Sequence, residues 1–145
     1  MNTLDPFSTP DSFRSWAYNN IVLKHESGIA RILDKKYNKG VLKQNCNVLV
    51  ERMDSLSLVD NFVKNSNLQS EEFMVFYCDK GMGYACLFKR LRDAFAHAHF
   101  HSPRNNWVEI GHSYKGRSDR LATRLFGRLK IASLKKLVAY IEVSN

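Results

Sequence analysis

The stretch GYACLFKRLRDAFAHAHF, residues 83–100, carries the clearest helical pattern in the 145-residue sequence and decides the fold that we expect. Its apolar side chains recur every three or four residues, which places them on one face of a helix. This face consists of Tyr84, Leu87, Phe88, Leu91, Ala94, Phe95 and Ala98. We expect a third helix that follows Ser70, with a kink near Gly81, and that ends before Pro103.

Two helices are expected before this stretch. Pro10, Asp11 and Ser12 are a helix-start signal, and the apolar spacing after them predicts a first helix that runs to about Tyr37. Apolar residues spaced by four, three, four and three predict an amphipathic second helix over residues 42–56. A polar loop at residues 65–70 then leads to the third helix.

The part after Pro103 has a different pattern. Residues 107–114 alternate as in a strand, residues 115–119 read as a turn, and a second strand is expected over residues 123–131. Ser133 is a candidate N-cap for a last helix. We therefore expect one mostly α-helical domain over residues 1–145, with a small β-hairpin before the last helix.

The net charge of +8 lies in one half of the chain. Residues 1–80 hold ten basic and ten acidic side chains, whereas residues 81–145 hold twelve and four. Clustered positive charge is typical of a polyanion-binding surface, although it also suits an ordinary basic surface.

Cys46, Cys78 and Cys86 have no metal-site spacing and are expected to be buried reduced thiols. With no long apolar run and no signal-peptide pattern, we expect a cytoplasmic protein without a membrane span.

Arg92, Asp93 and His97 are the candidate chemical residues. Asp93 and His97 lie four residues apart on the helix face opposite Leu91, so Asp93 can accept a hydrogen bond from the imidazole and orient it. Arg92 lies about 140° around the helix from His97, and only its long side chain or a distorted last turn lets it reach the same phosphate. The alternative is a solvated helix end with an incidental arginine and histidine.

The segment Leu91–His97 resembles the signature of the HEPN superfamily, in which an arginine and a polar residue precede a histidine on one helix. Residues 124–130 and 133–137 also resemble a plasmid- and bacteria-borne branch of HEPN ribonuclease-like proteins. The chain departs from the pattern at Asp93, where asparagine is commoner, and at Ala98, where glycine often follows the histidine.

The resemblance implies an up-and-down helical bundle that forms a homodimer and cuts RNA without a metal or cofactor. His97 would then act in acid–base catalysis, Arg92 would stabilise the phosphorane-like transition state, and Asp93 would position them, at a composite site between two chains. The 2′-hydroxyl is the internal nucleophile, so the products would be a 2′,3′-cyclic phosphate and a 5′-hydroxyl. Such a protein could be a toxin or defence effector with an antitoxin partner.

Two other functions remain open. A non-catalytic HEPN module would bind RNA or a protein partner and keep the motif for folding or dimerisation. A small basic DNA-binding protein is a third hypothesis, against which the weak helix-turn-helix signals argue.

Further residues are candidates for RNA contacts, although each alone is more often a solvated charge. They are Arg90, Arg104, Lys115, Arg117 and Arg120, and His99 could assist RNA binding or catalysis. Trp107 and Tyr114 could stack on bases, but their alternation favours packing. His97, His99 and His101 would share one face of a strand and could hold a metal; we prefer a helix end there and expect no metal.

Overall fold

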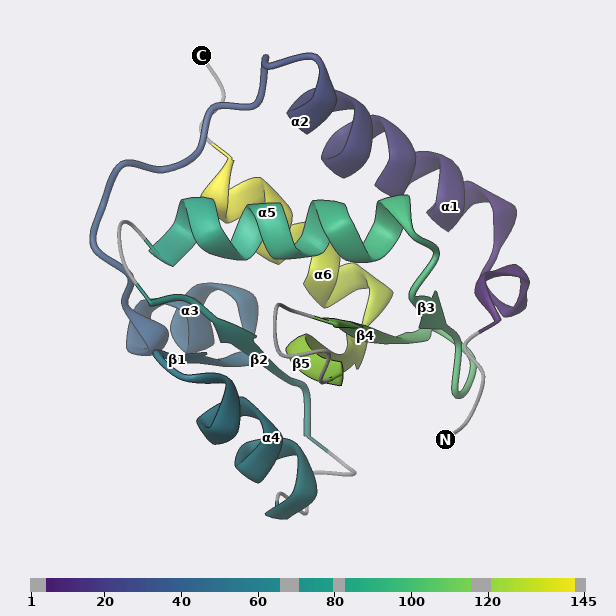
Figure 1. The fold of residues 1–145 in the computed structure, drawn as a ribbon. Helices are drawn as coiled ribbons and strands as arrows, with labels where there is room; N and C mark the ends of the chain where they lie inside the picture. Colours follow the sequence, from purple (N-terminus) through teal and green to yellow (C-terminus); the bar gives the residue numbers. More distant parts are fainter. Residues whose placement is uncertain (1–4, 66–70, 80–82, 116–120, 143–145) are drawn as a thin grey trace.

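A computed structural model describes residues 5–65, 71–79, 83–115 and 121–142, and it has an α/β fold around a five-stranded mixed sheet (Figure 1). The elements in chain order are η1 (Pro6–Ser8), α1 (Asp11–Ala17), η2 (Tyr18–Val22), α2 (Leu23–Glu26), α3 (Lys39–Cys46), β1 (Leu49–Met53), α4 (Leu56–Asn65), β2 (Phe73–Tyr77), α5 (Gly83–Ala96), β3 (Phe100–His101), β4 (Trp107–Lys115), β5 (Leu121–Lys130) and α6 (Ile131–Ile141). The strand order is β1-β2-β5-β4-β3. β1 and β2 are parallel, and the other neighbours are antiparallel.

The predicted mostly α-helical bundle is therefore wrong. Two segments with helix-like spacing are strands in the structure. The predicted helix over residues 42–56 ends at Cys46, where Asn47 takes a left-handed conformation (φ 60°), and the chain continues as β1. The start of the predicted third helix is β2. Spacing in short apolar runs fits a buried strand as well as a helix, so pairing within the sheet decides between them.

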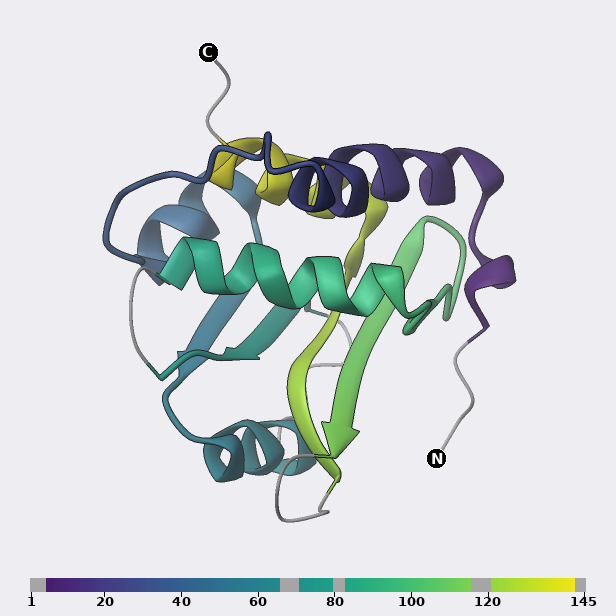
Figure 2. The ribbon, with the colours of Figure 1, turned by 45° about the horizontal axis from the view of Figure 1, so that its top comes forward.

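The interior position of β2, between β1 and β5, explains its unbroken apolar sequence FMVFY. Helix α4 covers one face of the sheet, where Phe62 contacts Phe73 with ring centroids 6.0 Å apart. Helix α5 crosses the other face (Figure 2), and Phe76 packs against Tyr37 with ring centroids 5.7 Å apart. A strand that is buried on both faces does not alternate apolar and polar residues.

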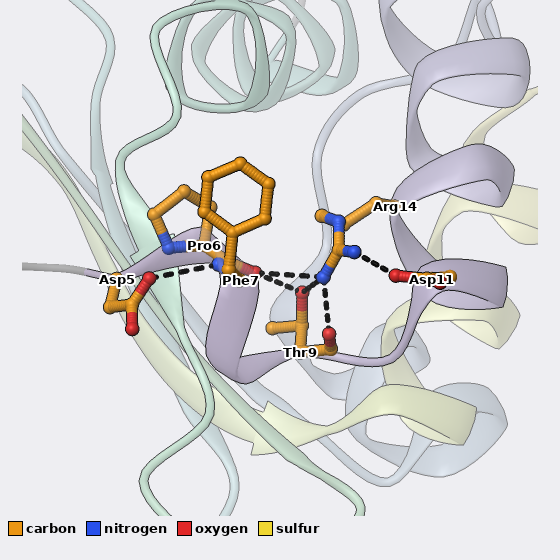
Figure 3. Close-up of polar contacts among 6 residues, drawn as sticks. All are labelled: Asp5, Pro6, Phe7, Thr9, Asp11 and Arg14. Carbon is orange, nitrogen blue, oxygen red and sulfur yellow. Dashed lines mark hydrogen bonds and ion pairs between the residues drawn. The ribbon is translucent and has the colours of Figure 1, made fainter.

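The first helix begins at Asp11, as predicted, but the helical run formed by α1, η2 and α2 ends at Glu26 rather than near Tyr37. Figure 3 shows how Arg14 ties this run to the turn before it: Nη1 donates to the carbonyl oxygens of Pro6 (3.3 Å) and Thr9, and Nη2 pairs with Asp11. Asp5 in turn caps η1 by accepting from the backbone N–H of Phe7 at 3.0 Å.

The turn that Arg14 holds also contacts the segment after β3. The backbone N–H of Ser102, just after β3, donates to Ser8 Oγ at 2.8 Å. The N-terminal segment thereby braces the connection between β3, which follows His99, and β4, which carries His112.

The C-terminal predictions are confirmed in outline. β4 and β5 pair as an antiparallel hairpin and a last helix follows, although α6 begins at Ile131 and encloses Ser133, which is buried rather than an N-cap. Residues 116–120 of the expected turn, residues 66–70 of the expected loop and the kink at Gly81 lie outside the described residues.

None of the three cysteines forms a disulfide; Cys46 and Cys78 are buried and Cys86 is half-buried, close to the prediction. No helix among the described residues is long and apolar enough to cross a membrane.

Candidate active site

The C-terminal end of α5 is built by a tight reversal of the chain. Ala98 adopts a left-handed conformation (φ 59°), its N–H donates to the carbonyl of Phe95 at 3.3 Å, and the N–H of His99 donates to that of Ala94 at 2.8 Å. These two bonds are the Schellman motif that commonly ends a helix, here with alanine where glycine is preferred. The N–H of Gly111 on β4 then donates to the His99 carbonyl at 3.0 Å, so the reversal fixes the histidines against the sheet.

An open pocket of about 490 Å³ lies between the end of α5 and β4. Its lining consists of Arg92, Asp93, His97, His99, His112 and Ser113. The three predicted catalytic residues thus line one pocket, together with the predicted RNA contact His99. A pocket of this size is in the range of small-ligand sites, and it is wide enough to admit a phosphodiester.

Three imidazoles gather in this pocket. The rings of His97 and His112 are stacked, with centroids 5.9 Å apart and planes 9° apart, and His99 lies 6.0 Å from His97 and 5.1 Å from His112. Nδ1 of His99 is 3.0 Å from Nδ1 of His112. One of these nitrogens must donate and the other accept, so the hydrogen bond holds at least one of the two rings neutral.

Burial sets the protonation of this pair. His112 is 4% exposed, and burial, with the charge of His99 next in size, lowers its pKa to about 4. Burial and the charge of His97 also lower the pKa of His99. Both groups are therefore neutral bases at pH 7. His97, by contrast, is exposed to solvent at the mouth of the pocket.

Arg92 is held by two carboxylates. Its Nη1 donates to Glu26 Oε1 at 3.0 Å, and its Nε lies 2.9 Å from Asp93 Oδ1 as an ion pair without the alignment of a hydrogen bond. Within the described residues the Asp93 carboxylate thus pairs with Arg92, whereas the sequence suggested His97 as its partner. Because a guanidinium has five N–H donors, these contacts leave others for a phosphate oxygen.

The other predicted RNA contacts are dispersed. Arg90 lies on α5 and donates from Nε to the Tyr77 carbonyl at 3.2 Å, whereas Arg104 stacks at 4.0 Å over the ring of Trp107 and does not line the pocket. Trp107 is buried, as the packing interpretation predicts. Arg117, Arg120 and the side chains of Tyr114 and Lys115 lie outside the described residues.

His112 and Ser113 were missed by the sequence reasoning, although a signal for His112 was present. Val108, Ile110 and His112 occupy alternate positions of the predicted strand, and all three are buried. A histidine that continues the buried face of a strand needs a polar partner, which His99 provides. The position of His112 opposite the end of α5 could not be read from the sequence, because it depends on the sheet order.

His101 continues the alternating histidines of the sequence but lies on β3, opposite Glu109 of β4 in the sheet register. It does not line the pocket. In the described parts of the chain, no three His, Cys, Asp or Glu side chains are grouped so that they could hold a metal ion. Comparison with models of protein families, with curated proteins and with solved structures found no match.

Proposed function

We propose that this protein is a metal-independent endoribonuclease whose active site is the pocket of His97, His99 and Arg92. The observation that supports it is the gathering of three imidazoles, two of them hydrogen-bonded to each other, beside a guanidinium in an open pocket. RNA transesterification needs a base for the 2′-hydroxyl, an acid for the leaving 5′-oxygen and a cation near the phosphate. The pocket offers a candidate for each.

The environment of each histidine suggests its role. His99 is neutral at pH 7, and in the tautomer in which its Nδ1–H donates to Nδ1 of His112, its Nε2 carries no proton and is the candidate base that removes the 2′-hydroxyl proton. His97, exposed at the mouth, is the candidate acid that protonates the 5′-oxygen. As the 2′-oxygen attacks phosphorus, the bond to the 5′-oxygen breaks, which gives a 2′,3′-cyclic phosphate and a 5′-hydroxyl. Arg92 donates to the charged non-bridging oxygens.

His112 acts in this proposal as a positioning residue. Its buried ring is hydrogen-bonded to His99 and fixes the tautomer and orientation of that imidazole, as carboxylates do in other sites. Both histidines come from one chain, so the acid–base pair is complete without a residue from a second copy. In this proposal a second copy of the chain or an antitoxin would regulate the pocket and would not supply a catalytic residue to it.

The test is cleavage of a labelled RNA oligonucleotide in EDTA, with the matching DNA oligonucleotide as a second substrate. We expect RNA alone to be cut, with His97→Ala and His99→Ala each slower by roughly 10²- to 10⁴-fold. His25→Gln is the matched control, since it removes an imidazole that stacks on Phe88, outside the pocket. RNA cleavage that persists in both alanine variants would refute the proposed site.

A second function is favoured by one observation, the pairing of Arg92 with two carboxylates, Glu26 and Asp93. The two carboxylates offset the positive charge of the Arg92 guanidinium, which would otherwise stabilise the phosphorane-like transition state. This arrangement suits a module that binds RNA or a protein without cutting RNA. The same assay distinguishes the two, because a wild-type protein that binds RNA tightly but leaves it intact would support the module.

A further inference from the structure

Two guanidinium groups meet one phenol ring at the end of β2. The Cζ atoms of Arg90 and Arg124 lie 5.6 Å and 5.7 Å from the centroid of the Tyr77 ring. Arg90 also donates from Nε to the Tyr77 carbonyl oxygen at 3.2 Å. These contacts restrict two long side chains in advance, so less conformational entropy is lost when an anion binds them. We call Arg90 and Arg124 the arginine pair.

Charged groups of both signs lie around the Tyr77 hydroxyl. Burial and the carboxylate of Asp79 raise the pKa of the Tyr77 hydroxyl, whereas the arginine pair acts in the opposite direction. Among the described residues, Arg90 and Arg124 are half-buried and Asp79 is exposed.

Helix α5 connects the arginine pair with the histidine pocket. Arg90, Asp93 and His97 follow at intervals of three and four residues, so they form a stripe along one face of α5. The stripe extends about 10 Å along the helix axis from Arg90 to His97. The charge of Arg90 is also among the causes that lower the pKa of His112, so its guanidinium acts on the pocket itself.

The β4–β5 hairpin also connects the histidine pocket with the arginine pair. Ser113 lines the pocket and shares a hydrogen bond of 3.0 Å with Thr123 on β5. Arg124 is the next residue, the extra residue of β5 at the bulge opposite His112 and Ser113. Bulges re-aim side chains and often border functional sites.

We infer that the arginine pair is a second phosphate subsite, which binds the phosphate next to the scissile one in a single-stranded RNA. The inference rests on the proposed function for the position of the scissile phosphate. The substrate class is then an RNA strand with at least two consecutive phosphates, bound along α5 from the histidine pocket to Tyr77. Arginine suits such a subsite because its planar fork matches two phosphate oxygens.

Chimeric substrates with one ribose test this inference. The smallest is a dinucleotide with a single phosphate after the ribose, and two trinucleotides add one deoxynucleotide on the 5′ or the 3′ side. Wild-type protein should gain about tenfold in kcat/KM from the added phosphate on one of the two sides, the equivalent of one charge-assisted contact. In Arg124→Gln the ratio of trinucleotide to dinucleotide should fall from about ten to about one.

Arg128→Gln is the matched control, because it removes an arginine from the same strand that is held by Glu109 at 2.9 Å. The Arg128→Gln variant should keep the full tenfold gain in kcat/KM from the added phosphate. An unchanged ratio in Arg124→Gln, or an equal loss in both variants, would overturn the subsite while cleavage by the wild type upholds the proposed function.

A binding measurement separates the two proposals further. For a 2′-O-methyl oligonucleotide, which cannot be cleaved, the slope of log Kd against log salt should shrink by about 0.7 in Arg124→Gln, the value for one lost phosphate contact on a single strand. If the wild type cuts none of the chimeric substrates, the nuclease proposal fails. In that case a reduced salt slope of log Kd in Arg124→Gln would still support phosphate binding by the arginine pair. An unchanged salt slope would overturn it.

Discussion

Acidification should destabilise this fold through His112, by an amount that follows from its burial. The pKa of this group is about 4 in the folded protein and about 6.5 in the unfolded chain. Below pH 6.5 the unfolded chain therefore binds a proton that the folded protein excludes, and stability falls until the pH passes 4. The difference between these two pKa values corresponds to about 3 kcal/mol lost between pH 7.5 and pH 4, with a steepest slope of about 1.2 kcal/mol per pH unit.

Urea unfolding of the wild type and of His112→Asn, at intervals from pH 7.5 to pH 4, measures this loss. Asparagine places a polar atom near Nδ1 of the lost ring, so it can still meet His99, but it does not titrate. The stability advantage of the wild type over the variant should shrink by about 3 kcal/mol over this range. Ser113→Ala, next to it on β4, removes no titratable group and should keep the wild-type slope.

Parallel pH profiles for the wild type and His112→Asn would refute the reasoning. That result would mean that His112 takes up its proton at the same pH in the folded protein as in the unfolded chain, so burial would not lower the pKa of this group.

Three further predictions concern single substitutions. Ala98→Gly should stabilise the fold by about 1 kcal/mol, because alanine is strained at φ 59°, whereas Ala96→Gly in the last turn of α5 should destabilise it by a similar amount; thermal unfolding compares them. Glu26→Gln removes one carboxylate from Arg92 and should lower KM for RNA several-fold at low salt; an increase in KM would contradict this role. Gly127→Val should destabilise the sheet by about 1–3 kcal/mol in urea unfolding, because even the first added carbon would lie 3.1 Å from a backbone oxygen of β2.

The sequence predicted best those elements whose pattern is long or whose boundaries carry a chemical signal. Helix α5, the start of α1 at Asp11, the β4–β5 hairpin and α6 all lie close to their predicted places. In each, the apolar spacing extends over several turns or strand repeats, or a helix-start residue marks the boundary.

The two strands that were predicted as helix, β1 and β2, share one physical cause, which is that short apolar runs do not determine their own secondary structure. The five residues of β2 are apolar in a row because α4 and α5 bury both faces of the strand, and neither helix is visible from within the run. β1 pairs with β2 in parallel, so its partner lies beyond α4 in the sequence. Both contacts are long-range, and a local pattern contains neither.

The correction of the fold changes how the candidate chemistry is assembled. A helical bundle would present Arg92, Asp93 and His97 on one helix, so a second imidazole would have to come from another chain. The sheet instead brings β4 against the end of α5, and His112 and the reversal at Ala98 hold His99 beside His97 in the same chain. If His99 and His97 are the base and the acid, then activity per chain should not depend on protein concentration across the range in which a dimer would dissociate. A loss of specific activity on dilution, restored by adding protein that carries His97→Ala, would instead show that the second chain completes the site.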